Sequence, residues 1–341
     1  MNNKIWRITL DTNPEDCNLK CIMCEEHSEF SNFKEKLFQK TGTRARRMPK
    51  AWIKDIFTEA KELGIKEIIP STMGEPLMYK NIEDFFVLAK ETGIKINLTT
   101  NGTFPKKKME EWSKLIIPVT SDTKVSFNGS TEETAILVMK KINYTEQINK
   151  IKEFVTYRNE HFKKTGFYSR ITLQLTFMQN NMHELSDIVK LSAALDIDRI
   201  KGHHLWTHCK EIEHLNFKKD ESSMNKWNKI VDEAKDTAEK HRKPDGSKVL
   251  LDQIEYLKLS ENKEVPKEYN CPFLEKELWI SATGKISPCC APDEQRDSLG
   301  DFGNYPETKI KDVLESEKYK DLAKNYKNHS LCKKCVMRKK D

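Results

Sequence analysis

Short apolar runs alternate with longer amphipathic segments through the first two thirds of the chain. The short runs predict strands and the segments with helical spacing predict helices. The expected strands are 5–10, 66–70, 95–99, 124–127, 171–177 and 199–205, and the expected helices are 49–63, 82–92, 106–115, 145–163 and 182–195. The middle strands recur about every thirty residues, as βα units do. Six such units indicate parallel strands with right-handed crossovers, in an open sheet or a partial barrel.

The pattern changes after residue 205. Residues 223–241 predict a charged amphipathic helix, 258–268 are polar and predict a loop, and short strands with frequent Gly and Pro follow from Cys271 onward. Five of the nine cysteines lie in this last segment. We therefore expect a barrel over residues 1–215, a helical linker over 216–268 and a small metal-held domain over 269–341.

The charge distribution favours a solvated surface over a nucleic-acid interface. The chain has 59 basic and 53 acidic residues, a net charge of +6, and the two signs are interspersed. The two local basic clusters, Arg44 with Arg46 and Arg47, and Lys333 with Lys334, Arg338, Lys339 and Lys340, lack interleaved stacking aromatics. Nucleic acid is therefore not an expected partner.

The cysteine content points to metal or redox chemistry. No apolar run is long enough to span a bilayer, and the N-terminus lacks a signal-peptide pattern, so a cytoplasmic location is expected. The 15 Phe, 9 Tyr and 6 Trp exclude a generic disordered chain. In a reducing compartment nine cysteines, an odd number, fit poorly with a set of disulfides.

Three of the cysteines follow the first strand at C-x3-C-x2-C spacing. Cys17, Cys21 and Cys24 can hold three corners of a [4Fe–4S] cube on one loop. No fourth cysteine is nearby, so one iron is left for a small molecule, much as a catalytic zinc site keeps one position open. The spacing fits neither a structural zinc knuckle nor a ferredoxin run.

This triad, with several later segments, resembles the radical S-adenosylmethionine (SAM) superfamily over residues 4–205. Met73-Gly74-Glu75-Pro76 resembles the family loop that binds the SAM amino group, with Met73 replacing a glycine. Thr99 and Asn101 belong to a Thr-Thr-Asn-Gly turn after the third strand, and Ser126 and Asn128 to a Ser-Phe-Asn-Gly turn after the fourth. Asn128 replaces the usual Asp. Met23, beside Cys24, stands where members have a residue near the adenine.

The resemblance implies an α/β partial (β/α)6 TIM-like barrel and a radical mechanism. SAM is expected to bind the open iron, and its reductive cleavage to give a 5′-deoxyadenosyl radical that takes a hydrogen atom from a substrate C–H bond. An electron donor such as flavodoxin or ferredoxin is the implied partner. The protein's part is to hold SAM, exclude water and direct the radical.

The second cysteine set consists of Cys271, Cys289, Cys332 and Cys335. On chemistry alone, a closed [4Fe–4S] cluster and a structural zinc ion are about equally supported. The arrangement, with Gly284 in a G-x4-C segment and a final C-x2-C, resembles the twitch domain, the truncated form of the SPASM domain that follows many radical SAM barrels. This resemblance implies one auxiliary [4Fe–4S] cluster without an open iron.

Two cysteines and one histidine remain as candidate catalytic residues. Cys290 adjoins a ligand and is a spare thiol, an alternative ligand or a hydrogen-atom donor. Cys209 is a buried apolar residue or such a donor. His203 is a candidate for substrate contact or general base work, and it points to the opposite face of its strand from His204.

The leading functional hypothesis is a radical SAM oxidoreductase that carries out net oxidation of a substrate C–H bond. The alternative is redox-neutral modification, such as epimerisation or cross-linking of a peptide, with a cysteine as hydrogen donor. A non-catalytic zinc or iron–sulfur scaffold is a third hypothesis, against which the Gly74-Glu75-Pro76 loop argues. The substrate, a small polar molecule or a peptide, and the oligomeric state are left open.

Overall fold

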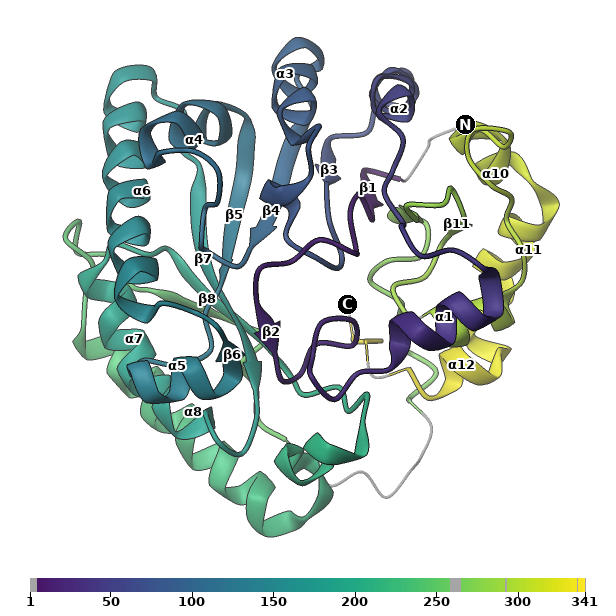
Figure 1. Ribbon diagram of the computed structural model, residues 1–341. Helices are drawn as coiled ribbons and strands as arrows, with labels where there is room; N and C mark the ends of the chain where they lie inside the picture. The colour runs from purple at the N-terminus through teal and green to yellow at the C-terminus, as the bar shows by residue number, and fades with distance from the viewer. Residues whose placement is uncertain (1–4, 258–264, 292, 336, 341) are drawn as a thin grey trace.

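The computed structural model describes residues 5–257, 265–291, 293–335 and 337–340, and a curved nine-stranded sheet forms its centre (Figure 1). The strand order is β11-β10-β1-β3-β4-β5-β7-β8-β9, and every neighbouring pair is parallel except β10–β11. The strands are β1 (Arg7–Leu10), β3 (Glu67–Ile69), β4 (Lys95–Thr100), β5 (Thr120–Ser126), β7 (Arg170–Phe177), β8 (Arg199–His204), β9 (Leu250–Asp252), β10 (Glu277–Ile280) and β11 (Ile286–Ser287). A separate pair joins β2 (Lys20–Cys21) to β6 (Met139–Lys140).

Helices cover the outer face of the sheet. The main ones are α2 (Lys50–Glu62), α3 (Ile82–Thr92), α4 (Met109–Ile116), α6 (Tyr144–Thr165), α7 (Leu185–Ala194) and α8 (Glu221–Lys240). Alternate strand residues such as Ile8, Leu98 and Leu173 are fully buried against them in one large apolar core. Because side chains alternate along a strand, the residues between them face the inside of the curve.

The expected α/β architecture is confirmed, with local differences. All six predicted strands and all six predicted helices are present, although the fourth strand begins at Thr120 rather than at residue 124. The pattern did not predict α1 (Phe33–Thr41), which buries none of its residues, nor α5 (Glu132–Val138) and the two-residue strands β2 and β6, which are too short to show periodicity. Residues 258–264 of the predicted loop lie outside the described residues.

The C-terminal segment shares the central sheet. Strand β10 pairs in parallel with β1, with Arg7 opposite Glu277 and Leu10 opposite Ile280. The short helices α9 (Asp293–Arg296), α10 (Ile310–Glu315), α11 (Glu317–Asn325) and α12 (Ser330–Lys333) follow. Tyr305 packs edge-on against Trp52 of α2 with ring centroids 5.7 Å apart. The segment that carries the last five cysteines is therefore joined to the barrel through β1 and α2.

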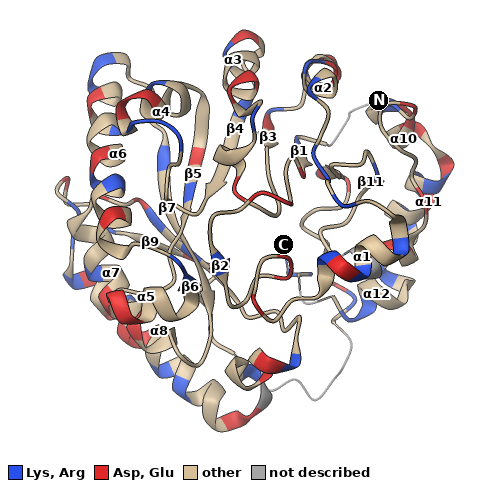
Figure 2. Cartoon of the chain, in the orientation of Figure 1, with Lys and Arg blue, Asp and Glu red and all other residues tan. Residues whose placement is uncertain are grey.

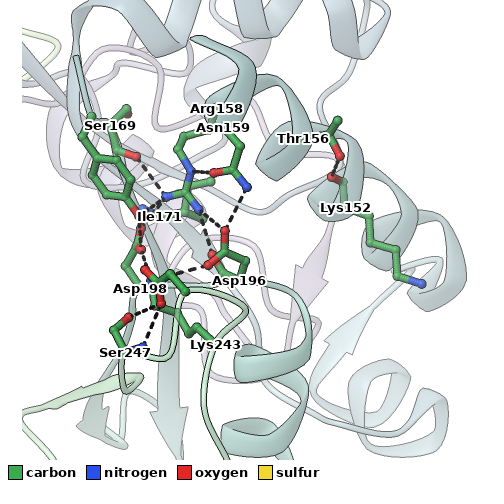
Figure 3. Close-up of polar contacts among 12 residues, drawn as sticks. Lys152, Thr156, Arg158, Asn159, Ser169, Ile171, Asp196, Asp198, Lys243 and Ser247 are labelled. Atoms are coloured by element: carbon green, nitrogen blue, oxygen red, sulfur yellow. Dashed lines mark hydrogen bonds and ion pairs between the residues drawn. The ribbon is translucent and has the colours of Figure 1, made fainter. Parts of the chain in front are cut away.

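A buried ion-pair network stabilises one end of the sheet (Figure 3). Arg158 of α6 is fully buried and donates to Asp198 at 2.7 Å and to Asp196 at 3.3 Å. Lys243, after α8, lies 3.0 Å from Asp198, which also accepts from the Ile171 backbone. Because Asp198 precedes β8 and Ile171 opens β7, the network lies at the amino ends of these strands, away from the loops at their carboxyl ends.

The surface carries both signs of charge. Lys and Arg alternate with Asp and Glu along the outer helices (Figure 2). Among the helices of the described residues, none has the length and hydropathy that a membrane crossing requires.

Candidate cluster and SAM site

The first cysteine set lies on the loop that follows β1. All three thiols are half-buried, and the backbone amides of Leu19 and His27 point at the sulfurs of Cys17 and Cys24 at 3.5 and 3.3 Å. Burial, and then the neighbouring thiols of Cys24 and Cys17, raise the pKa of Cys21. The three thiols therefore lie near enough to act on one another, and a cationic metal centre would favour their thiolate forms.

The Gly74 loop packs directly on the cysteine loop. Gly74 has φ +75°, and an added Cβ would lie 2.3 Å from the carbonyl oxygen of Asn13 and 2.8 Å from that of Asp16. The Glu75 amide donates to the Asp16 carbonyl at 2.7 Å. The Asn13 side chain donates to the Glu75 carbonyl at 2.9 Å. Only glycine allows this approach of the two backbones.

The Glu75 carboxylate faces the protein interior. It accepts hydrogen bonds from the Thr100 hydroxyl at 2.7 Å, the Asn101 amide at 2.7 Å and the Leu77 amide at 3.2 Å. Burial raises the pKa of Glu75 to about 7, and these donors counteract the shift. The side chain thus joins the Gly-Glu-Pro loop to the Thr-Asn-Gly turn. Asn101 in turn donates to the Cys17 sulfur at 3.9 Å.

Arginines from the segment before α2 connect both flanks of the triad. Arg46 is buried and donates to Glu15 at 2.7 Å and to Glu26 at 2.6 Å. Arg47 forms a two-pronged pair with Asp16 at 2.5 and 2.7 Å. The sequence marked these arginines only as a basic cluster. The signal for their role was the acidic residues on either side of the three cysteines.

The other expected SAM contacts lie along the carboxyl ends of β3, β4 and β5. Met73, Thr99 and Ser126 are partly exposed, and Pro76 is buried as the first residue of a short 3-10 helix. Asn128 is buried, and its side-chain oxygen accepts from the Thr176 amide at 2.8 Å. Met23 packs on a second apolar cluster beneath the loop. The carboxyl ends of parallel strands are where such folds bind ligands.

The second cysteine set contains five thiols. Cys289 and Cys290 share a hydrogen bond that lowers the pKa of Cys289 and raises that of Cys290. Burial raises the pKa of Cys332, and next the nearby thiols of Cys289, Cys335 and Cys271 act in the same direction. Cys290 also interacts with Cys335 and Cys271. The thiol that the sequence left unassigned therefore lies within the predicted ligand group.

A buried guanidinium, that of Arg338, joins the chain segments around this second site. Arg338 donates to the carbonyls of Tyr269 at 2.7 Å, Pro266 at 2.8 Å and Cys332 at 3.2 Å. The Cys271 amide points at the Tyr326 hydroxyl at 3.1 Å. These contacts bring together segments that are some sixty residues apart in the sequence.

The remaining candidates occupy two different environments. His203 lies on the inner face of β8, where its ring nitrogens contact Thr176 at 3.1 Å and Gln174 at 3.4 Å. The surrounding protein, and then the charges of Lys201 and Lys218, lower the pKa of His203 and favour a neutral ring. His204 packs outward among aromatic rings, as the strand alternation predicted. Cys209 packs on the same second apolar cluster as Cys17, Cys21 and Met23.

Both donor sets suit iron–sulfur clusters. The first offers three thiols on one loop and the second five, in agreement with one open and one closed cubane. Within the described ranges, no group of three or more His, Cys, Asp or Glu side chains is spaced to hold a single metal ion.

Comparison with known proteins identifies the family. The model of the radical SAM superfamily matches residues 14–191. The chain belongs to the radical SAM superfamily. The SPASM model, described as an iron–sulfur cluster-binding domain, matches residues 271–336. The two matches confirm the resemblance and imply SAM and [4Fe–4S] clusters as cofactors.

Relatives of this radical SAM protein are distant. The PqqA peptide cyclase of Bradyrhizobium diazoefficiens is 25% identical over 192 residues, which are 54% of this chain and 43% of the cyclase. The chain therefore spans less than half of that relative. Streptococcus suis SuiB bound to SAM superposes with a TM-score of 0.68 at 17% identity, covering 98% of this chain and 71% of SuiB. The SAM-bound anSMEcpe superposes with a TM-score of 0.65 at 17% identity, covering 97% of this chain and 86% of anSMEcpe. These structures share the fold.

Proposed function

We propose that the protein is a radical SAM enzyme that abstracts a hydrogen atom from a peptide substrate for net oxidation. The observation that carries this proposal is the pairing of a three-thiol loop with a separate five-thiol site. When bound, SAM and the first cluster supply a 5′-deoxyadenosyl radical, and the auxiliary cluster supplies an acceptor for one electron.

We assign the first cluster to Cys17, Cys21 and Cys24. The loop that holds them is joined to the barrel by Arg46 and by Glu75, so its shape does not depend on the cluster alone. Because the Glu75 carboxylate is occupied by Thr100 and Asn101, we assign SAM binding at this loop to the backbone rather than to that side chain.

The peptide substrate is supported by relatives. The cyclase match is named for a peptide, SuiB is also known bound to the precursor peptide SuiA, and anSMEcpe to a Cp18Cys peptide. A redox-neutral reaction is the second candidate, since Cys209 lies beside the apolar cluster that supports the triad. Cys290 is less suited to donate hydrogen, because it belongs to the auxiliary thiol group.

Two anaerobic measurements test this proposal. The reconstituted protein with SAM and a strong reductant should form 5′-deoxyadenosine, and failure to cleave SAM would exclude the enzyme assignment. With a modified peptide in hand, incubation in deuterated water separates the two reactions. Net oxidation gives a product lighter by about two mass units, whereas a thiol donor introduces deuterium at the product carbon.

A further inference from the structure

Backbone and side-chain amides point at sulfurs of the first cysteine set. The Leu19 amide lies 3.5 Å from the Cys17 sulfur, and the Asn101 side-chain amide lies 3.9 Å from the same atom. The His27 amide lies 3.3 Å from the Cys24 sulfur, the shortest of these three contacts. Hydrogen bonds to the ligand sulfurs are among the factors that set the reduction potential of an iron–sulfur cluster.

The His27 amide belongs to a tight turn that follows Cys24. The Ser28 amide donates to the Cys24 carbonyl at 3.3 Å, which closes the turn. Arg46 holds the same turn through its 2.6 Å ion pair with Glu26. The turn therefore has two supports that do not involve the His27 ring, and we expect it to persist when that ring is changed.

The His27 ring joins this turn to the other flank of the cysteine loop. Its Nε2 atom lies 2.7 Å from the carbonyl oxygen of Pro14, which is buried. Because a carbonyl only accepts, Nε2 carries the hydrogen and donates it. The acceptor is itself held in place, since the neighbouring Asn13 donates to the Glu75 carbonyl at 2.9 Å. The ring of one residue thus bonds to a fixed carbonyl, and its backbone amide bonds to a cluster ligand, Cys24.

We infer that His27 is a positioning residue whose ring, bonded to Pro14, aims its own amide at the Cys24 sulfur and makes the first cluster easier to reduce. This inference rests on the proposed function, which assigns the first cluster to the triad, and adds a residue that sets its potential. Reduction by one electron adds a negative charge to the cluster, and the positive end of the N–H dipole stabilises that charge. Substitution leaves a backbone amide in place, so the ring is the group through which its direction can be tested.

His27→Phe removes the donor and keeps a planar ring. The full chain is reconstituted anaerobically, reduced stepwise with dithionite and redox mediators, and followed by electron paramagnetic resonance, in which the first cluster is the signal that SAM changes. We expect the equilibrium constant for its reduction to fall about tenfold, which is about 59 mV for a one-electron couple. His27→Gln should restore most of this loss, because the terminal amide of Gln donates from nearly the position of Nε2.

His241→Phe is the matched control. The Nδ1 atom of His241 lies 3.1 Å from the Thr237 carbonyl at the carboxyl end of α8. The same substitution therefore removes a comparable contact between a histidine and a carbonyl, on a helix rather than on the cysteine loop. It should leave the reduction of both clusters unchanged. The auxiliary cluster should keep its potential in the two His27 variants as well.

An unchanged potential of the first cluster in folded His27→Phe, or a shift that His27→Gln does not reverse, would overturn the inference. If His27→Phe does not assemble the cluster, the unsubstituted protein labelled with ¹⁵N-histidine decides. Pulsed electron paramagnetic resonance should then show the weak coupling of an amide nitrogen near the cluster. No ¹⁵N coupling, or the strong coupling of a ring nitrogen bound to iron, would overturn the inference. Iron content and SAM cleavage of the unsubstituted protein are measured separately, so the inference can fail while the proposed function stands.

Discussion

The two cysteine sites are built in opposite ways. The first places three thiols within eight residues of one loop, and its surroundings come from the barrel through Arg46, Gly74 and Glu75. The second gathers five thiols from three segments between residues 271 and 335. A site with one donor too few for a cubane keeps a position open for a ligand. We expect a site with one donor too many to hold a closed cluster that serves electron transfer.

The largest expected effect comes from removing the first donor set. Cys17→Ala combined with Cys21→Ala and Cys24→Ala should reduce iron from about eight to about four atoms per chain and abolish SAM cleavage. Iron analysis after anaerobic reconstitution measures the iron content, and chromatography of 5′-deoxyadenosine measures SAM cleavage. Retention of all eight irons would contradict the division into two sites.

Gly74→Ala tests whether the close approach of the two loops shapes the first site. The added Cβ would meet the Asn13 carbonyl at 2.3 Å, so the cysteine loop must move, and we expect iron to be lost from the first site alone. Gly93→Ala is the matched control, because Gly93 has φ +77° with nothing within 4 Å of the added Cβ. It should cost only about 1–2 kcal/mol of backbone strain. Equal iron content in the two variants would exclude the steric account.

Arg46→Met tests the ion pairs that join the flanks of the triad. The change leaves the buried Glu26 without its arginine, whereas Glu15 keeps Lys34 at 3.2 Å, so the free energy of unfolding should fall by about 3 kcal/mol. Arg47→Met removes an exposed pair, and its cost should stay under about 1 kcal/mol. Urea unfolding of the reconstituted proteins measures both. Similar losses in the two variants would show that burial does not distinguish these arginines.

Cys290→Ser should have the smallest effect. Four thiols remain at the second site, so iron content should stay at about eight atoms per chain. Cys289→Ser should behave similarly if its neighbour replaces it as ligand, whereas the double variant should lose the auxiliary iron. Loss of about four irons from Cys290→Ser alone would make Cys290 a required ligand.

The sequence predicted what is local and left out what is long-range. The βα units were predictable because hydrophobic periodicity and the glycines that end helices, such as Gly64 and Gly93, are local signals. The triad was predictable because its ligands are neighbours in the chain. The pairing of β10 with β1 was not, since it joins residues some 270 positions apart. Nor was the place of Cys290, which depends on how three distant segments meet.

The assignments of side chains to SAM show the same limit. Glu75 matches the family motif and Asn128 stands where members have Asp, but their polar atoms bind Asn101 and Thr176 of the protein itself. A motif gives the residue type at a position and not the partner that its side chain takes. Whether these residues also contact SAM through their backbone stays a prediction.

Electron paramagnetic resonance with and without SAM tests the central claim most directly. Two reduced proteins are compared: one with Cys332→Ala and Cys335→Ala, which keeps the first site, and one with the triad replaced, which keeps the second. The open first cluster should change its spectrum when SAM is added, and the closed second cluster should not. No change in the first protein, or a change in the second, would contradict the account.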